Sequence, residues 1–254
     1  MNRDTERFAF LFATMNVVDF PLRGLKNAKA CLRVARLIRN RLVQSPDMKV
    51  VSVATLDSRA YFSILNRLKM TNLSFVSLTP IQARLQRTNT VITTRGERGF
   101  FEGTAIPIED LDENPIVMEG QILSRMSLET RRVLLIGIDP GLRIGVVVFY
   151  GDSKLGSFTV ESVGRLCSEL RMIVRGIPNI RAIVRVGDGA PRLSKSISQM
   201  IGSEFRDVTL EVVDERGTTK NRRKSDGPTG DQGAAARIAR RKGVSLTESC
   251  GRKN

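Results

Sequence analysis

The sequence contains no histidine and no tryptophan. Without histidine, the chain cannot form a Ser-His-Asp triad, a Cys-His dyad, an HExxH zinc site or a histidine proton shuttle. Any hydrolysis or group transfer would therefore depend on carboxylates, lysine, hydroxyl groups or bound metal. Aromatic residues are also scarce, with two tyrosines and eleven phenylalanines. This scarcity argues against a protein that binds single strands mainly by base stacking.

Cysteines and long apolar runs are also few. Cys31, Cys167 and Cys250 are odd in number and far apart, so they predict no disulfide framework or zinc knuckle and suggest a reducing compartment. The apolar runs are well short of the roughly 20 residues of a membrane-spanning helix. Residues 1–15 include a short apolar run but no convincing signal-cleavage site. We expect a soluble cytoplasmic protein with no membrane partner.

Positive charge is in excess and unevenly distributed. The formal net charge of +15 predicts an anionic partner, with nucleic acid the leading candidate. Residues 216–242 hold nine basic residues against two acidic ones, and residues 1–43 hold nine against three. Residues 102–120 instead hold six acidic residues and no basic one. We interpret residues 102–130 as an acidic linker region between two domains.

Residues 1–101 are predicted to form a small α/β domain of Rossmann-like type. The expected elements are a strand at 8–15, a helix at 25–43, a strand at 49–55, a helix at 57–69 capped by Asp57, and strands at 73–79 and 90–95. Alternating strands and helices are typical of a parallel sheet. The glycine-rich segment 96–103 lacks the Lys-Ser/Thr of a phosphate-binding loop, so it is predicted to be a turn. No motif assigns a role to this domain.

Residues 131–245 are predicted to form a second α/β domain, followed by a flexible tail at 246–254. VLLIGID (133–139) is apolar throughout, as expected for a central strand buried on both faces. The later elements are strands at 144–150, 155–160, 181–186 and 208–213 and helices at 161–175, 192–204 and 231–242. This β-β-β-α-β-α-β-α order predicts a mixed five-stranded sheet, with a meander preceding α/β units.

Acidic residues stand at the ends of these expected elements. Asp139 closes the first strand, Asp188 follows the fourth, Asp214 and Glu215 close the fifth, and Asp231 opens the last helix. Functional residues of open α/β sheets collect at the carboxyl ends of strands. Carboxylates that converge there repel one another, and a hard cation such as Mg²⁺ relieves this repulsion. Two such ions can support phosphodiester hydrolysis without histidine.

Three stretches of this region resemble the RuvC/YqgF (RuvX-like) branch of the ribonuclease H-like superfamily. They are GIDPGLRIGVVVF (137–149), VVDERGTT (212–219) and DQGAAARIA (231–239). The resemblance covers about residues 131–245 and implies a ribonuclease H-like fold. It also implies a nuclease that uses Mg²⁺ or Mn²⁺ to cleave Holliday-junction DNA or precursor ribosomal RNA. A homodimer would supply the two sites that a junction resolvase needs.

The same resemblance assigns roles to the acidic residues. Asp139 would bridge the metals, with Glu215 the second ligand and Asp231 the third. Asp214 is a weaker candidate than Glu215, because adjacent side chains of a strand point to opposite faces. Asp188 departs from the YqgF pattern, which usually has no acid there, whereas junction resolvases carry a glutamate nearby. It is either a further metal ligand or a polar turn residue.

Basic and hydroxyl side chains around the last two site elements are expected to bind backbone phosphates. They are Arg216, Thr218, Lys220, Arg222, Arg223, Lys224, Arg237, Arg240 and Arg241. Simpler structural interpretations remain open: Asp139 could merely begin an Asp-Pro-Gly turn, Asp231 could cap a helix, and residues 220–231 could form a solvated loop.

Two other functions are compatible with the sequence. A non-catalytic nucleic-acid-binding or ribosome-binding protein could retain the fold, and would bind in a salt-dependent way without Mg²⁺ and without products. An actin-like ATPase shares the superfamily, but we find neither a duplicated domain nor an adenosine motif in this sequence. The leading prediction is a Mg²⁺-dependent nuclease.

Overall fold

The computed structural model describes residues 50–126, 133–178, 181–214, 231–241 and 243–245. The chain divides into two compact units between Leu111 and Asp112. The predicted strand at 8–15, the predicted helix at 25–43 and the predicted tail at 246–254 lie outside the described residues.

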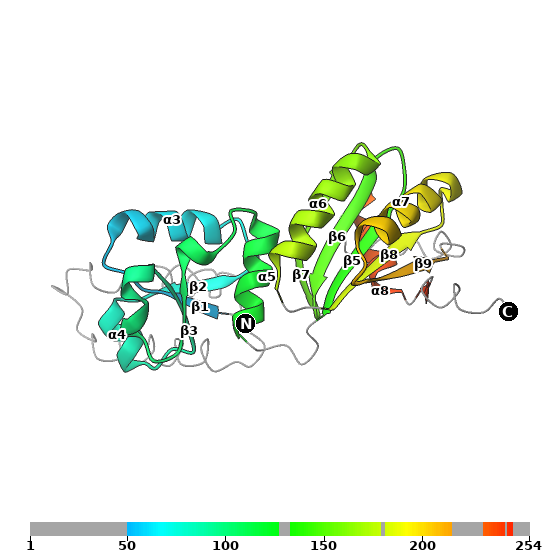
Figure 1. Ribbon diagram of the computed structural model, residues 1–254. Helices are drawn as coiled ribbons and strands as arrows, with labels where there is room; N and C mark the ends of the chain where they lie inside the picture. Colours follow the sequence, from blue (N-terminus) through cyan, green and yellow to red (C-terminus); the bar gives the residue numbers. More distant parts are fainter. Residues whose placement is uncertain (1–49, 127–132, 179–180, 215–230, 242, 246–254) are drawn as a thin grey trace, which may run out of the picture. The chain divides into compact units, whose positions relative to one another are not determined.

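The first unit contains a four-stranded sheet in the order β2-β1-β3-β4, with all neighbouring strands parallel (Figure 1). Its elements are β1 (Val50–Val53), α3 (Ser58–Leu68), β2 (Ser74–Ser77), α4 (Pro80–Leu85), β3 (Thr90–Thr93), the 3-10 helix η1 (Arg95–Phe100), β4 (Thr104–Pro107) and the 3-10 helix η2 (Ile108–Asp110). The prediction of a small α/β domain with a parallel sheet is therefore confirmed.

Capping side chains fix where the two α-helices of this unit begin. The Asp57 carboxylate accepts hydrogen bonds from the backbone amides of Arg59 and Ala60 at 2.8 and 3.1 Å, so α3 starts where the sequence predicted. The six-residue helix α4 was not predicted, because it is too short to show a helical period. Thr79 and Gln82 exchange side-chain-to-backbone hydrogen bonds of 3.2 and 3.0 Å, which is a capping box.

Glu97 connects the loops that follow β1 and β3. Its carboxylate accepts hydrogen bonds from the Leu56 amide at 2.7 Å and from the hydroxyls of Thr94 and Thr93 at 2.9 and 3.3 Å. Burial would raise the pKa of Glu97, but hydrogen bonds from Thr55, the Leu56 amide, Thr94 and Thr93 together lower it. The charged carboxylate therefore holds the two loops together.

The second unit contains a six-stranded sheet in the order β10-β9-β8-β5-β6-β7. Its elements are α5 (Pro115–Met126), β5 (Val133–Asp139), β6 (Ile144–Tyr150), β7 (Ser153–Val160), α6 (Val163–Gly176), β8 (Arg181–Gly187), α7 (Pro191–Glu204), β9 (Val208–Val213), α8 (Asp231–Arg240) and β10 (Val244–Ser245). Strands β5, β6 and β7 form an antiparallel meander, and β8 and β9 extend the sheet in parallel from β5. This is the expected ribonuclease H-like arrangement, extended by the two-residue strand β10, which was not predicted.

The described part of the predicted linker region, residues 102–126, is not a separate linker. It is divided between the units, because β4 pairs with β3 in the first and α5 packs in the second. A Cβ atom built on Gly176 of α6 would lie 2.5 Å from a methyl group of Val117, which shows how closely α5 and α6 approach. The acidic residues Glu109 and Asp110 are exposed, whereas Val117 and Ile122 are fully buried. The acidic residues of this segment suggested a linker, but the exposed ones lie between buried apolar positions.

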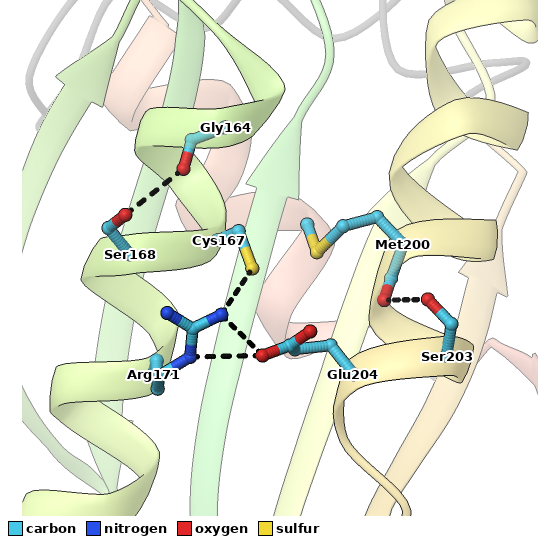
Figure 2. Close-up of polar contacts among 7 residues, drawn as sticks. All are labelled: Gly164, Cys167, Ser168, Arg171, Met200, Ser203 and Glu204. Atoms are coloured by element: carbon cyan, nitrogen blue, oxygen red, sulfur yellow. Dashed lines mark hydrogen bonds and ion pairs between the residues drawn. The ribbon is translucent and has the colours of Figure 1, made fainter.

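Helices cover both faces of the second sheet, α6 and α7 on one face and α8 on the other (Figure 1). Figure 2 shows the polar contact between α6 and α7, in which Arg171 donates from Nε to the Glu204 carboxylate at 3.0 Å and from Nη2 to the Cys167 sulfur at 3.7 Å. On the opposite face, α8 lies directly against Gly137 of β5. A Cβ atom at Gly137 would be only 2.3 Å from the Ala235 carbonyl oxygen.

Candidate acidic site at the carboxyl edge of the second sheet

Asp139 is the last residue of β5, which lies between β6 and β8 in the sheet. It pairs with Gly145 of β6, and it lies one residue beyond the pair formed by Ile138 and Val186 of β8. This register places Asp139 level with Gly187. Both positions beside the half-buried Asp139 are therefore glycines, Gly145 and Gly187.

Asp139 faces the side of the sheet that α8 covers. Side chains two residues apart in a strand point to the same face, so Asp139 shares the face of Gly137, against which α8 packs. Near the start of α8, Gln232 accepts a hydrogen bond of 2.9 Å from the Ser157 hydroxyl of β7. The helix that begins at Asp231 therefore starts over the same face as Asp139. The Asp231 side chain itself lies outside the described part of the chain.

Asp188 and Asp214 follow two further parallel strands at the same edge of the sheet. They come immediately after the pair formed by Gly187 of β8 and Val213 of β9. The Asp188 amide donates a hydrogen bond of 3.1 Å to the Val213 carbonyl. Within the described residues, which include Asp139, Asp188 and Asp214, no three acidic or cysteine side chains form a group that could hold a metal ion. Asp139, Asp188 and Asp214 therefore do not form such a group by themselves, and the predicted ligand roles stay predictions.

Part of the predicted site lies outside the described residues. This part comprises Glu215 and the phosphate-binding candidates Arg216, Thr218, Lys220, Arg222, Arg223 and Lys224. The assignments of these residues stay predictions.

The three predicted arginines at the end of α8 are all exposed. The Arg240 guanidinium lies 5.3 Å from the centre of the Phe149 ring, a cation–π contact. Arg241 donates from Nη1 to the Asp214 carbonyl oxygen at 2.8 Å, which links the end of α8 to the end of β9. Together with Arg237, these residues form a basic end of α8.

A part-buried ion pair between Arg185 of β8 and Glu211 of β9 was not predicted from the sequence. Arg185 Nε and Glu211 Oε2 are 2.8 Å apart, and each side chain is only 13% exposed. Arg185 Nη1 also donates to the Ala239 carbonyl of α8 at 2.5 Å. A signal was present in the sequence, because charges of opposite sign stand inside two expected strands that are otherwise largely apolar, RAIVRV and VTLEVV.

By fold, the second unit is an α/β domain of ribonuclease H-like type with acidic residues along the carboxyl edge of its sheet. In the part of the chain that the structure covers, no helix has both the length and the apolar character needed to cross a membrane.

Comparisons with known proteins add little to this description. No family model matches the chain, and no curated protein matches it. Among solved structures, the chain is similar to the Argonaute of Marinitoga piezophila in complex with a 5′ OH guide RNA. The TM-score is 0.27 and the identity is 9%, over 69% of this chain and 41% of that chain. Similarity this low transfers no activity, and the fold assignment rests on strand order and direction.

Proposed function

We propose that the chain is a metal-dependent nuclease of the RuvC/YqgF kind that hydrolyses phosphodiester bonds in structured nucleic acid. The substrate would be branched DNA of the Holliday-junction type or precursor ribosomal RNA, in the cytoplasm. The position of Asp139 carries the proposal. This acid ends a central strand level with two glycines, on the face where α8 packs, and α8 begins at a second acid, Asp231.

The chemistry of the proposed donors suits a divalent metal ion. Asp139, Asp231 and Glu215 would offer only carboxylate oxygens, which are the ligands that Mg²⁺ and Mn²⁺ prefer. Asp188 would be a fourth ligand of the same kind. When bound, two such ions would activate a water molecule and stabilise the leaving oxygen. The chain has no histidine, so none of its residues could replace the metal as an imidazole base.

The basic end of α8 would hold the nucleic-acid backbone. A guanidinium has five N–H donors, so Arg241 keeps donors for a phosphate while one of them binds the Asp214 carbonyl. The Phe149 ring positions the Arg240 guanidinium without using any of its donors. Arg237 adds a third exposed charge. These side chains would bind phosphates by charge and geometry, independently of base sequence.

The test is cleavage of a four-way DNA junction and of a precursor ribosomal RNA by the Asp139→Asn variant in Mg²⁺ or Mn²⁺. Changing a residue that only supports a metal ligand costs about 10–100-fold, so loss of a direct ligand should lower the rate by more than about 100-fold. Asp152→Asn is the matched control, because Asp152 is exposed in the turn after β6, at the opposite end of the strand from Gly145. The proposal is wrong if Asp139→Asn cleaves like the wild-type chain, or if the wild-type chain cleaves neither substrate.

One observation favours the alternative of a non-catalytic nucleic-acid-binding protein. The acids in the described residues do not by themselves form a metal-binding group. Such a protein would bind the same substrates equally well in Mg²⁺ and in EDTA, with an affinity that falls as salt rises. Fluorescence anisotropy in both buffers, with gel analysis of the recovered substrate, separates the two functions.

A further inference from the structure

Arg185 lies in the interior of β8 and connects three elements of the second unit. It pairs with Glu211 of β9 and donates to the Ala239 carbonyl in the last turn of α8, with distances of 2.8 and 2.5 Å. Glu211 also accepts a hydrogen bond of 3.1 Å from the Gly243 amide, just after α8. The pair thus attaches the end of α8, and the turn that follows it, to two strands of the sheet.

Stability alone is a weak explanation for this pair. Moving two charges out of water costs several kcal/mol per ion in typical proteins, and apolar replacements of similar size are often neutral or stabilising. An apolar pair could fill the same space between α8 and the strands. It could not donate a hydrogen bond to a chosen carbonyl of α8. The specific property of Arg185 is therefore the fixed position that it gives to Ala239.

Fixing one end of α8 also fixes the other. Gly137 sets the distance between α8 and the sheet, because Ala235 and Ala239 occupy the space of its missing side chain. The nine residues from Asp231 to Ala239 span about 12 Å of rigid helix. A small rotation at Ala239 would therefore move the start of the helix across the face that carries Asp139.

We propose that Arg185, supported by Glu211, is a positioning residue that fixes α8 on the Asp139 face of the sheet and so places the start of α8 relative to Asp139. This inference rests on the proposed function, in which Asp139 and the first residue of α8 hold the same metal. In this role Arg185 would act through the backbone of α8 and would not itself bind the metal.

The test compares Arg185→Met with the double variant Arg185→Met/Glu211→Met in the full chain. The single variant leaves the part-buried Glu211 without its cation, so its Tm should fall. The double variant removes both charges, so its Tm should return close to the wild-type value. Mn²⁺ affinity should be about 10–100-fold weaker than wild type in both variants. It is measured by the decrease in the electron paramagnetic resonance signal of the free ion as Mn²⁺ binds. Backbone amides of α8 should also exchange hydrogen about tenfold faster in both, while those of α6 and α7 are unchanged.

The matched control removes an ion pair on the other face of the same sheet. Arg171→Met/Glu204→Met eliminates the contact between α6 and α7 shown in Figure 2. Because this pair does not touch α8, Mn²⁺ affinity should stay within about twofold of wild type.

The positioning role is overturned if the double variant recovers Mn²⁺ affinity together with its Tm, or if the control weakens Mn²⁺ binding equally. If the wild-type chain binds Mn²⁺ tightly but cleaves neither nucleic acid, only the proposed function is overturned. The Mn²⁺ affinity of the variants then still tests the positioning role. If the wild-type chain binds no Mn²⁺, the proposed function is overturned. If amide hydrogen exchange in α8 is then also unchanged in the double variant, the positioning role is overturned as well.

Discussion

Gly137 controls how closely α8 approaches the sheet, and a single methyl group should test this. In Gly137→Ala the new Cβ atom would lie 2.3 Å from the Ala235 carbonyl oxygen and 2.6 Å from the Ala239 Cβ atom. Since both belong to one helix, α8 must shift, and we expect a loss of about 1–3 kcal/mol in urea unfolding. Gly202→Ala in α7 is the control: its Cβ atom meets nothing within 4 Å, so helix propensity should add about 0.5–1 kcal/mol. Equal stability of the two variants would contradict a tight contact at Gly137.

Glu97 should make the first unit sensitive to acid. Its folded-state pKa lies below the ordinary value of 4.5. The ionised carboxylate therefore stabilises the fold fully above that pH, and the stabilisation disappears as pH falls through the lowered pKa. We expect Glu97→Gln to reduce the free energy of unfolding at neutral pH and to flatten its decline as the pH falls below about 4.5. Exposed Glu102 provides the control Glu102→Gln, whose acid profile should match that of the wild-type chain.

At the scale of whole elements, α3 depends on its first residue outside the helix. Asp57 accepts hydrogen bonds from the Arg59 and Ala60 amides, which have no partner within the helix. Asp57→Ala should therefore destabilise the first unit by about 1 kcal/mol, whereas Asp57→Asn should keep most of the stability because it keeps an acceptor oxygen. Urea unfolding of both variants measures the difference. Similar losses in the two variants would mean that the carboxylate charge matters more than the cap.

Elements also show how much of the fold the sequence could predict. The apolar run 133–139 became β5, and Asp57 began α3 as expected. Apart from the 12-residue helix α5, which lay in the predicted linker region, the elements missed were short: six-residue α4, four-residue β4 and two-residue β10. Segments of this length show no clear period, and they form because neighbours cap or pair with them. The linker prediction was wrong for a related reason, since exposed acids in turns outweighed the buried apolar positions between them.

At the scale of the whole molecule, a net charge of +15 should make nucleic-acid binding strongly dependent on salt. The slope of log affinity against log salt counts the phosphates contacted. Arg237→Ala should reduce the magnitude of that slope by about 1 for a junction or a precursor RNA. Arg206→Ala is the control, because exposed Arg206 precedes β9, at the end of the strand away from Asp214. Equal slopes for both variants and the wild-type chain would remove Arg237 from the interface.

For the candidate site too, the sequence predicted features that depend on a local pattern and missed contacts between distant segments. The order of the motifs and the strand-end positions predicted Asp139, because a carboxylate after an apolar run needs no distant partner to be noticed. The arginine–glutamate pair at Arg185 and Glu211 went unnoticed, although each charge was visible inside its strand. Their contact depends on the parallel pairing of β8 with β9, which aligns the two residues.

Composition alone limits the chemistry that is open to this protein. Lack of histidine left carboxylates, lysine, hydroxyl groups or bound metal for any hydrolysis, and the excess of arginine and lysine predicted an anionic partner. Only the tertiary structure decided which groups share a face. Arg185 and the Ala239 carbonyl, which it contacts, are 54 residues apart in the sequence. Asp139 lies on the same face of β5 as Gly137, and the missing side chain of Gly137 lets α8 pack against that face. Such contacts are set by sheet register and helix packing, which act between distant segments and leave no local pattern in the chain.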